Sequence, residues 1–190
     1  MNRVDRLLQQ WRIRKVLPWI GDRARVLDVG CFDASLFEAL GPRLATGVGL
    51  DPLLDHTIEG ERYRLTRNRF PDDPVEGAPF DAITMLAVLE HAPANDVARW
   101  ASACWSLLAD NGVVVATIPS PAVDKVLPVL SALRIVDGMS LEEHHGFEPA
   151  DARTAFEHAG FRMIHHARFQ LGFNNLFVFQ KTSASRTNGR

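Results

Sequence analysis

The chain has 190 residues, of which 46% are hydrophobic and 23% charged, and its formal net charge is −2. This length suits one substantial hydrophobic core rather than two full domains, and the near-neutral charge gives no sign of a nucleic-acid-binding protein. No apolar run approaches the ~18 residues that would cross a bilayer. We therefore expect a single-domain cytoplasmic protein with no integral membrane segment and with its two cysteines reduced.

Residues 1–20 predict an N-terminal helix. Apolar residues recur there at roughly helical spacing, and arginine and lysine residues occupy the other faces. We expect this helix to lie across the edge of a sheet or the mouth of a ligand site. Because basic residues beside tryptophans suit a lipid interface, contact with a membrane surface is the alternative to simple packing.

Residues 25–40 predict a buried strand, a tight loop and the start of a helix. The strand ends in Asp28-Val29-Gly30. Gly30 lets the chain turn without a Cβ, and the first N–H groups of the next helix lack partners within it. This geometry can bind a ligand, although an ordinary strand-to-helix turn has the same pattern.

A second buried strand ends in Asp51, which follows Gly30 by 21 residues. A carboxylate beside a glycine turn can accept both hydroxyls of a ribose, so a dinucleotide or an adenosyl ligand would fit. Asp28 favours the adenosyl ligand, because a carboxylate there repels a pyrophosphate and attracts a cation. The Gly-x-Gly-x-x-Gly spacing of dinucleotide sites is also missing, which disfavours a nicotinamide-dependent oxidoreductase.

The rest of the chain continues this alternation of strands and helices. The connection after Asp51 leaves room only for a short or irregular helix. Residues 121–147 interrupt the pattern after the fifth strand and predict a lid or substrate wall, or a helix folded on the core. Residues 182–190 predict a flexible tail, so the expected domain spans residues 1–181. The remaining expected elements are strands at 63–66, 80–86 and 112–118, helices at 97–108 and 148–159, and a closing hairpin of 161–170 and 176–181.

Four motifs resemble those of the class I, Rossmann-like S-adenosylmethionine (SAM) methyltransferases. They are residues 26–31, 49–52, 80–91 and 108–115, and the similarity extends from about residue 24 to residue 181. The resemblance implies an α/β fold: a seven-stranded, mostly parallel sheet with helices on both faces and a C-terminal antiparallel hairpin. It also implies SAM as the cofactor and a small molecule as the methyl acceptor.

The predicted cofactor-binding residues lie at the strand ends. We expect Asp51 to bind the ribose, Asp28 to face the positive end of SAM, and Leu86 to lie on the adenosyl side. Gly30 and Cys31 would contribute backbone contacts on the methionine side. The full predicted set is Asp28, Gly30, Cys31, Phe32, Asp51, Pro52, Phe70 and Leu86.

Several positions leave alternatives open. Phe70 would lie against the adenine ring or would instead cover the core. The family loop usually has glycine at the positions of Phe32 and Ala34, and an acidic residue where this chain has Arg69. Phe32 can pack beside the loop, whereas Ala34 would place a Cβ near the ligand. A catalytically silent protein that binds SAM or its demethylated product, S-adenosylhomocysteine (SAH), is therefore the alternative function.

Methyl transfer from a sulfonium requires an aligned acceptor and exclusion of water, and a hydroxyl acceptor also needs a general base. His91, which follows the strand at 80–86, is one candidate; His144 and His145 in the expected lid are the others. Each could instead make a structural hydrogen bond or face solvent. Because histidines rather than an amine-binding Asn-Pro-Pro-Tyr motif lie near the mouth, we prefer O-methylation.

A metal site is not expected. Some methyltransferases of ubiquinone synthesis and of small RNA carry Glu-x-x-Glu-His in the loop after the fourth strand. Glu90 and His91 match the last two positions, but Ala87 replaces the first glutamate. With that ligand missing, no metal is assigned.

Overall fold

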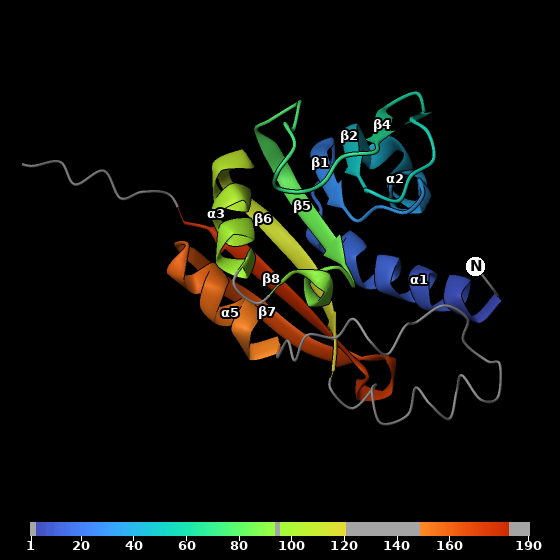
Figure 1. The fold of residues 1–190 in the computed structure, drawn as a ribbon. Helices are drawn as coiled ribbons and strands as arrows, with labels where there is room; N and C mark the ends of the chain where they lie inside the picture. Colours follow the sequence, from blue (N-terminus) through green and yellow to red (C-terminus); the bar gives the residue numbers. More distant parts are fainter. Residues whose placement is uncertain (1–2, 94–95, 121–148, 183–190) are drawn as a thin grey trace, which may run out of the picture.

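The computed structural model describes residues 3–93, 96–120 and 149–182, which form one eight-stranded sheet covered by helices (Figure 1). The strands are β1 (Ala24–Val29), β2 (Leu44–Leu50), β3 (Ile58–Glu59), β4 (Tyr63–Thr66), β5 (Phe80–Leu86), β6 (Leu108–Pro119), β7 (Phe161–Phe169) and β8 (Asn174–Lys181). The helices are α1 (Arg3–Val16), α2 (Ser35–Leu40), α3 (Val97–Leu107) and α5 (Pro149–His158). Short 3-10 turns are η1 (Leu17–Trp19), η2 (Gly41–Arg43), η3 (Leu89–His91) and η5 (Gln170–Gly172).

The strand order in the sheet is β3-β4-β2-β1-β5-β6-β8-β7. Strands β4, β2, β1, β5 and β6 are parallel, whereas β8 is antiparallel to both β6 and β7. The expected α/β fold with a C-terminal antiparallel hairpin is therefore confirmed. The chain order reverses between β1 and β5, and ligands of such sheets bind at the carboxyl ends of the strands that flank this point.

Two details differ from the sequence-based expectation. The short helix expected between β2 and β4 is not found among the described residues. Instead β3 folds back on β4, with Ile58 opposite Leu65, and adds an eighth strand at the edge. Strand β6 begins at Leu108, earlier than expected, because Leu108 already pairs with Phe80 before a register shift. The early start of β6 lies at the amino end of β5, away from the carboxyl ends of β1 and β5.

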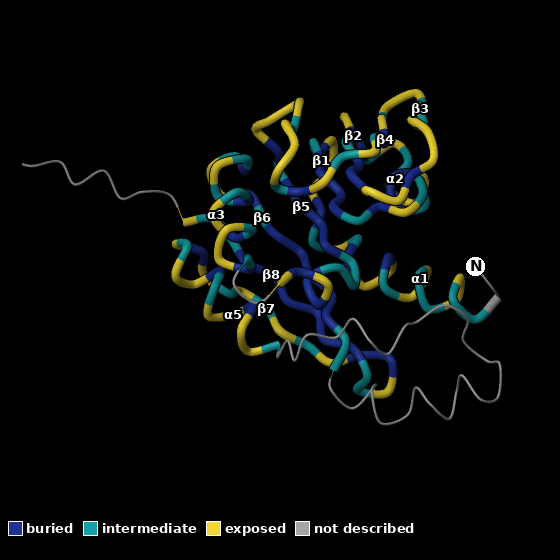
Figure 2. Tube along the Cα trace, in the orientation of Figure 1, coloured by how far each residue is buried: buried dark blue, intermediate teal, exposed yellow. Residues whose placement is uncertain are grey.

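The central strands send alternate side chains into two cores. Leu27 and Val29 of β1 belong to the core beneath α3 and α5, and Val26 belongs to the core beneath α1 and α2. All three are at most 2% exposed. Full burial of such a side chain stabilises the fold by about 1.5–3 kcal/mol. Figure 2 shows the resulting dark-blue sheet between two helical layers whose outer sides are exposed.

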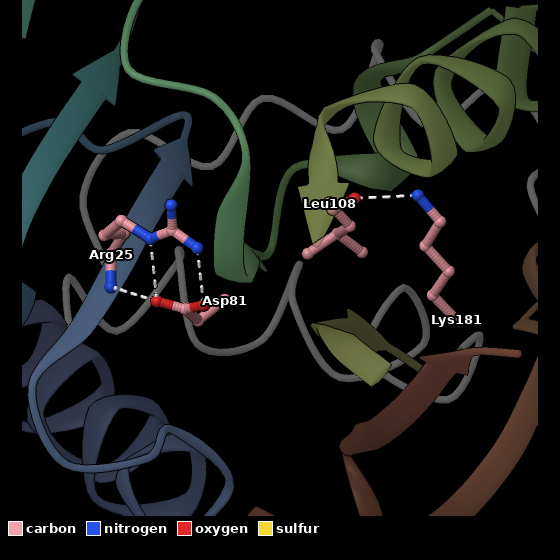
Figure 3. Close-up of polar contacts among 4 residues, drawn as sticks. All are labelled: Arg25, Asp81, Leu108 and Lys181. Atoms are coloured by element: carbon pink, nitrogen blue, oxygen red, sulfur yellow. Dashed lines mark hydrogen bonds and ion pairs between the residues drawn. The ribbon is translucent and has the colours of Figure 1, made fainter. Parts of the chain in front are cut away.

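Lys181 of β8 caps the C-terminal end of α3. Its Nζ donates hydrogen bonds to the carbonyls of Leu108 (2.7 Å, Figure 3) and Trp105 (2.8 Å), and it lies 5.2 Å from the centre of the Trp105 ring. The last carbonyls of a helix lack intrahelical partners and attract cations. Strand β8 therefore helps to set where α3 ends and β6 begins.

An ion pair joins the amino ends of β1 and β5 (Figure 3). Arg25 Nη2 and Nε donate to Asp81 Oδ1 (2.9 Å) and Oδ2 (3.1 Å), and the Arg25 backbone N–H donates to Oδ2 (2.8 Å). Hydrogen bonding to the guanidinium lowers the pKa of Asp81. Both side chains are about 40% exposed, so water screens the pair, and its main effect is to align two strands whose far ends form a crevice.

Some expectations concern segments beyond these elements. The expected lid, residues 121–147, and the tail from residue 183 onward lie outside the described residues. The single-domain organisation over 1–181 stays a prediction. Within the described ranges no helix is both long enough and apolar enough to cross a membrane.

Candidate functional site

A cleft of about 400 Å³ lies at the carboxyl ends of β1 and β5. This volume is within the range of sites that bind small molecules, roughly 300–1,000 Å³. One wall comes from the loop after β1, another from the end of β5, and a third from α1. The residues that line it from the ends of β1 and β5, the loop after β1 and the start of α2 are Asp28, Gly30, Cys31, Phe32, Asp33, Leu36, Leu86 and Ala87.

Gly30 is required at the bottom of the cleft by its conformation and by its surroundings. Its φ is +70°, and a Cβ there would lie 2.4 Å from Cγ2 of Val88. The Gly30 N–H donates to the Leu50 carbonyl (2.7 Å), which ties the loop to β2. Any side chain at this position would therefore meet both strain and a steric clash.

Asp51 is not among the residues that line this cleft. It is only 7% exposed, and its Oδ2 accepts the Phe32 N–H (2.9 Å) while its Oδ1 accepts the Leu53 N–H (2.8 Å). A carboxylate offers about four acceptor sites, so two remain for the hydroxyls of a ligand. Asp51 thus joins the backbone of the loop after β1 to that of the loop after β2.

Phe32, not Ala34, is the position in the loop that would favour glycine. Phe32 has φ +53°, in the left-handed region that costs about 1–2 kcal/mol for an L-residue. Ala34 has φ −82° and ψ 4°, which any residue can adopt, and it does not line the cleft. The sequence-based concern about Ala34 is therefore corrected. The Phe32 side chain is 56% exposed, so its ring lies at the rim rather than filling the cleft.

Asp28 makes the floor of the cleft receptive to positive charge. It is 4% exposed, and its Oδ1 accepts a hydrogen bond from Thr84 Oγ1 at 2.6 Å. The pKa of Asp28 is raised to about 7, mainly by burial and to a smaller extent by the negative charges of Asp33 and Asp51, against the lowering effect of the Thr84 hydrogen bond. A cationic ligand would offset the cost of ionising this carboxyl.

Helix α1 supplies polar residues to the cleft that the sequence analysis did not identify. Asp5, Gln9 and Arg12, at i, i+4 and i+7, all line it. Gln9 Nε2 also donates to Asp33 Oδ1 at 3.2 Å, which joins the helix to the loop. The signal was a polar stripe at helical spacing within an N-terminal helix expected near the mouth.

Arg12 is the cation of this stripe. Burial lowers the pKa of its guanidinium, and the nearby charge of Glu90 opposes that shift. Arg12 Nε has no hydrogen-bond partner within the part of the chain that is described. A largely buried guanidinium that lines a cleft can bind a carboxylate through charge-assisted hydrogen bonds.

Turn η3 follows β5 beside the cleft and carries Glu90 and His91. Glu90 is 6% exposed, burial raises its pKa to about 7, and its Oε2 has no hydrogen-bond partner among the described residues. His91 is exposed and does not line the cleft. His144 and His145 lie outside the described residues, so a catalytic role for each histidine stays a prediction. Residues 3–93, 96–120 and 149–182 contain no group of three side chains that could hold a metal.

Phe70 and Pro52 lie away from the cleft lining. Phe70 is 4% exposed, and its ring packs edge-to-face on Trp100 with the ring centres 5.3 Å apart. This packing corresponds to the second of the two alternatives for Phe70, in which its ring covers the core. Pro52 is exposed, and its carbonyl accepts a hydrogen bond from Arg67 Nε at 3.2 Å. Contacts of Phe70 and Pro52 with a cofactor stay predictions.

The sequence matches the methyltransferase domain family over residues 2–166. The chain belongs to this family. The methyltransferase family that the motifs implied is thereby confirmed. The cleft of this methyltransferase lies where the strand order of the sheet reverses, as expected for the fold.

Known proteins are similar to this methyltransferase in sequence and, separately, in fold. A ubiquinone biosynthesis O-methyltransferase of Xylella fastidiosa is 33% identical over 167 residues, which are 80% of this chain and 65% of that relative. The chain therefore spans slightly less than two thirds of that protein. Among solved structures, a magnesium protoporphyrin IX methyltransferase of Synechocystis with bound SAH has a TM-score of 0.68 at 18% identity, with 96% of this chain and 89% of that chain covered.

A second solved structure is an N-methyltransferase, NodS, of Bradyrhizobium japonicum. It has a TM-score of 0.66 at 14% identity and covers 96% of this chain and 98% of its own. At these identities the two structures establish the fold alone. The fold of the methyltransferase accordingly leaves the acceptor atom open, because the two neighbours are named for different acceptors.

Proposed function

We propose that this methyltransferase transfers the methyl group of SAM to a hydroxyl group of a small molecule, in the cleft between β1, β5 and α1. The observation that carries the proposal is the buried carboxyl of Asp28, whose pKa is raised to about 7. SAM combines a nucleoside with a positive charge on sulfur, and that charge would stabilise the ionised form of Asp28.

The two ends of SAM have complementary groups in the chain. Arg12, which lines the cleft, would pair with the methionine carboxylate, and Asp28 would face the positive charge. Asp51 would accept ribose hydroxyls with the acceptor sites that Phe32 and Leu53 leave free. This arrangement would orient the cofactor along the loop after β1.

A hydroxyl acceptor is supported by the name of the Xylella fastidiosa relative, an O-methyltransferase at 33% identity. Bound SAM would supply an activated methyl group. The chain would hold the acceptor in line and exclude water, for which Leu8, Ile13 and Leu86 provide apolar cleft walls. A base near neutral pKa would assist, and His91 is the described candidate at the end of η3.

A methyl-transfer assay tests this function. The protein is incubated with SAM that carries a labelled methyl group and with separate panels of hydroxylated aromatics and of amines. We expect label in a hydroxylated acceptor, and loss of most of that label in Asp51→Asn. The matched control is Asp55→Asn, which changes an exposed carboxyl in the loop after β2 and should retain transfer.

Two outcomes would contradict the proposal in different ways. Label only in amines would overturn the hydroxyl preference and leave the methyltransferase reaction intact. Binding of SAM and SAH in calorimetry, with no label transferred to either panel or to a cell extract, would instead support the silent SAM-binding alternative.

A further inference from the structure

Helix α1 has an unusual distribution of polar and apolar side chains on its two sides. The side toward the sheet buries Ile13 and Val16 but also directs polar residues into the cleft. The opposite side exposes two large apolar side chains, Leu7 (69% exposed) and Trp11 (42% exposed). A surface helix of a globular protein normally keeps its apolar residues on the buried stripe. The exposed pair therefore calls for an explanation beyond packing.

Cations surround this exposed pair. Leu7, Trp11, Arg14 and Lys15 stand at i, i+4, i+7 and i+8 and share one side of α1, which we call the outer face. Arg14 and Lys15 are both exposed. Helix α1 contains five cationic residues and one acidic residue, in a chain with a formal net charge of −2. The positive charge is thus concentrated on the helix that carries the exposed apolar side chains.

A third exposed apolar side chain lies beside α1. Leu171 is 91% exposed at the tip of η5, and the neighbouring Gln170 donates from Nε2 to the Leu8 carbonyl of α1 at 3.0 Å. Turn η5 joins β7 to β8 at the carboxyl edge of the sheet, where α1 also lies (Figure 1). Leu7, Trp11 and Leu171 thus come from two segments that are held together by this hydrogen bond.

We propose that the outer face of α1, together with Leu171, docks the protein on an anionic lipid surface. Arg14 and Lys15 would attract anionic headgroups, and Leu7 and Trp11 would enter the interfacial layer. Single protruding side chains suit a fluid interface, which adapts its shape to them. A helix of 14 residues is only about 21 Å long, so α1 would lie on the bilayer and not cross it.

Docking in this way would place the cleft next to the lipid. Helix α1 forms one wall of the cleft with Gln9 and Arg12, and its other side would contact the headgroups. Only the diameter of a helix, about 10 Å, would separate the two. The docking surface uses none of the residues proposed to bind SAM, so its test is independent of methyl transfer.

Sedimentation with lipid vesicles tests the proposal on the full chain. We expect binding to vesicles of phosphatidylcholine mixed with phosphatidylglycerol, no binding to phosphatidylcholine alone, and weaker binding as salt rises. Each cation near an anionic surface contributes about fivefold in affinity, so Arg14→Gln with Lys15→Gln should weaken binding roughly 30-fold. Leu7→Ser with Trp11→Ser should remove most of the remaining binding.

Matched controls lie on β7, an edge strand of the sheet whose exposed side chains are not part of the proposed docking surface. Ile164→Ser with Arg162→Gln changes an exposed apolar side chain and an exposed cation of β7, and should leave vesicle binding unchanged. Circular dichroism should show native folding for every variant, because all the altered side chains are exposed. If the unaltered protein stays in solution with anionic vesicles at low salt, or if the α1 variants bind as well as it does, the proposal is wrong. An acidic protein surface would then be the next binding partner to test for the outer face of α1.

Discussion

Replacing Asp28 with asparagine should remove a pH dependence that this single carboxyl gives to both stability and SAM binding. The residue is 4% exposed, and burial raises its pKa from 3.8 to about 7. The asparagine amide oxygen can still accept the hydrogen bond that Thr84 Oγ1 makes with Oδ1 at 2.6 Å. The change therefore removes the charge while keeping the shape of the site.

The size of the effect follows from the pKa shift. A gap of roughly 3 units, at 1.36 kcal/mol per unit, corresponds to at most about 4 kcal/mol against the ionised form of Asp28 in the empty cleft. The folded state retains a proton that the unfolded state releases near pH 4. The contribution of Asp28 to stability is therefore present below that pH and is lost as pH rises through about 7. Asp28→Asn should be the more stable protein, relative to the unaltered chain, on the alkaline side of this range.

SAM binding should show the opposite trend with pH. A cation favours the ionised carboxylate, so SAM affinity should rise by up to about tenfold per unit as pH approaches 7 and should level off above it. SAH lacks the positive charge on sulfur and should show a smaller slope. Asp28→Asn should flatten the slope for SAM and should reduce the preference for SAM over SAH.

Calorimetric titration of SAM and SAH between about pH 6 and pH 8, in buffers of different ionisation enthalpy, measures both the affinities and the protons released. Thermal melting without ligand over the same range measures the stability effect. Asp55→Asn is the control, since it removes an exposed carboxyl in the loop after β2. Equal pH slopes for SAM in the unaltered protein and in Asp28→Asn would refute the electrostatic reasoning.

Three further predictions concern the loop and the sheet. Phe32→Gly should be more stable than Phe32→Ala by about 1 kcal/mol in chemical denaturation, because only glycine relieves the φ of +53°; equal stabilities would show that the backbone carries no strain. Lys181→Met should lower the free energy of unfolding by about 2 kcal/mol, because two carbonyls at the end of α3 lose a charged donor, whereas Lys15→Met should not. Gly30→Ala should weaken SAM binding at least tenfold in titration, since its Cβ would lie 2.4 Å from Val88 Cγ2. Adding Val88→Ala should restore part of the lost affinity. Full SAM affinity in Gly30→Ala alone would contradict the clash.

Most of the fold could be predicted because its elements carry strong periodic signals. The apolar stripe of α3 and the buried runs of β1 and β5 depend on local spacing, and the structure places them where the pattern indicates. The connection from β2 to β4 could not be predicted in this way. Its length excluded a full helix, but pairing of Ile58 with Leu65 depends on an exposed edge of the sheet that only the assembled fold provides.

The candidate site could be predicted only where it lies next to a strand end. Asp28, Gly30 and Leu86 line the cleft as expected, because residues that end neighbouring parallel strands meet at one edge of the sheet. The contribution of α1 depends on how that helix lies over the sheet, which no local pattern specifies. The strain at Phe32 was also hidden, since the sign of φ follows from the path of the loop and not from residue type.

The hydrogen bond from the Phe32 N–H to Asp51 would couple the order of the loop after β1 to a nucleoside bound at this carboxylate. A nucleoside that engages the same carboxylate would share it with this amide, so nucleoside binding and ordering of the loop would become one thermodynamic event. Amide hydrogen exchange at Phe32 should consequently slow when a nucleoside is bound, whichever part of the ligand the rest of the protein contacts. Substitutions that make the backbone at Phe32 more flexible would then weaken the binding of ligands that the substituted side chains do not contact.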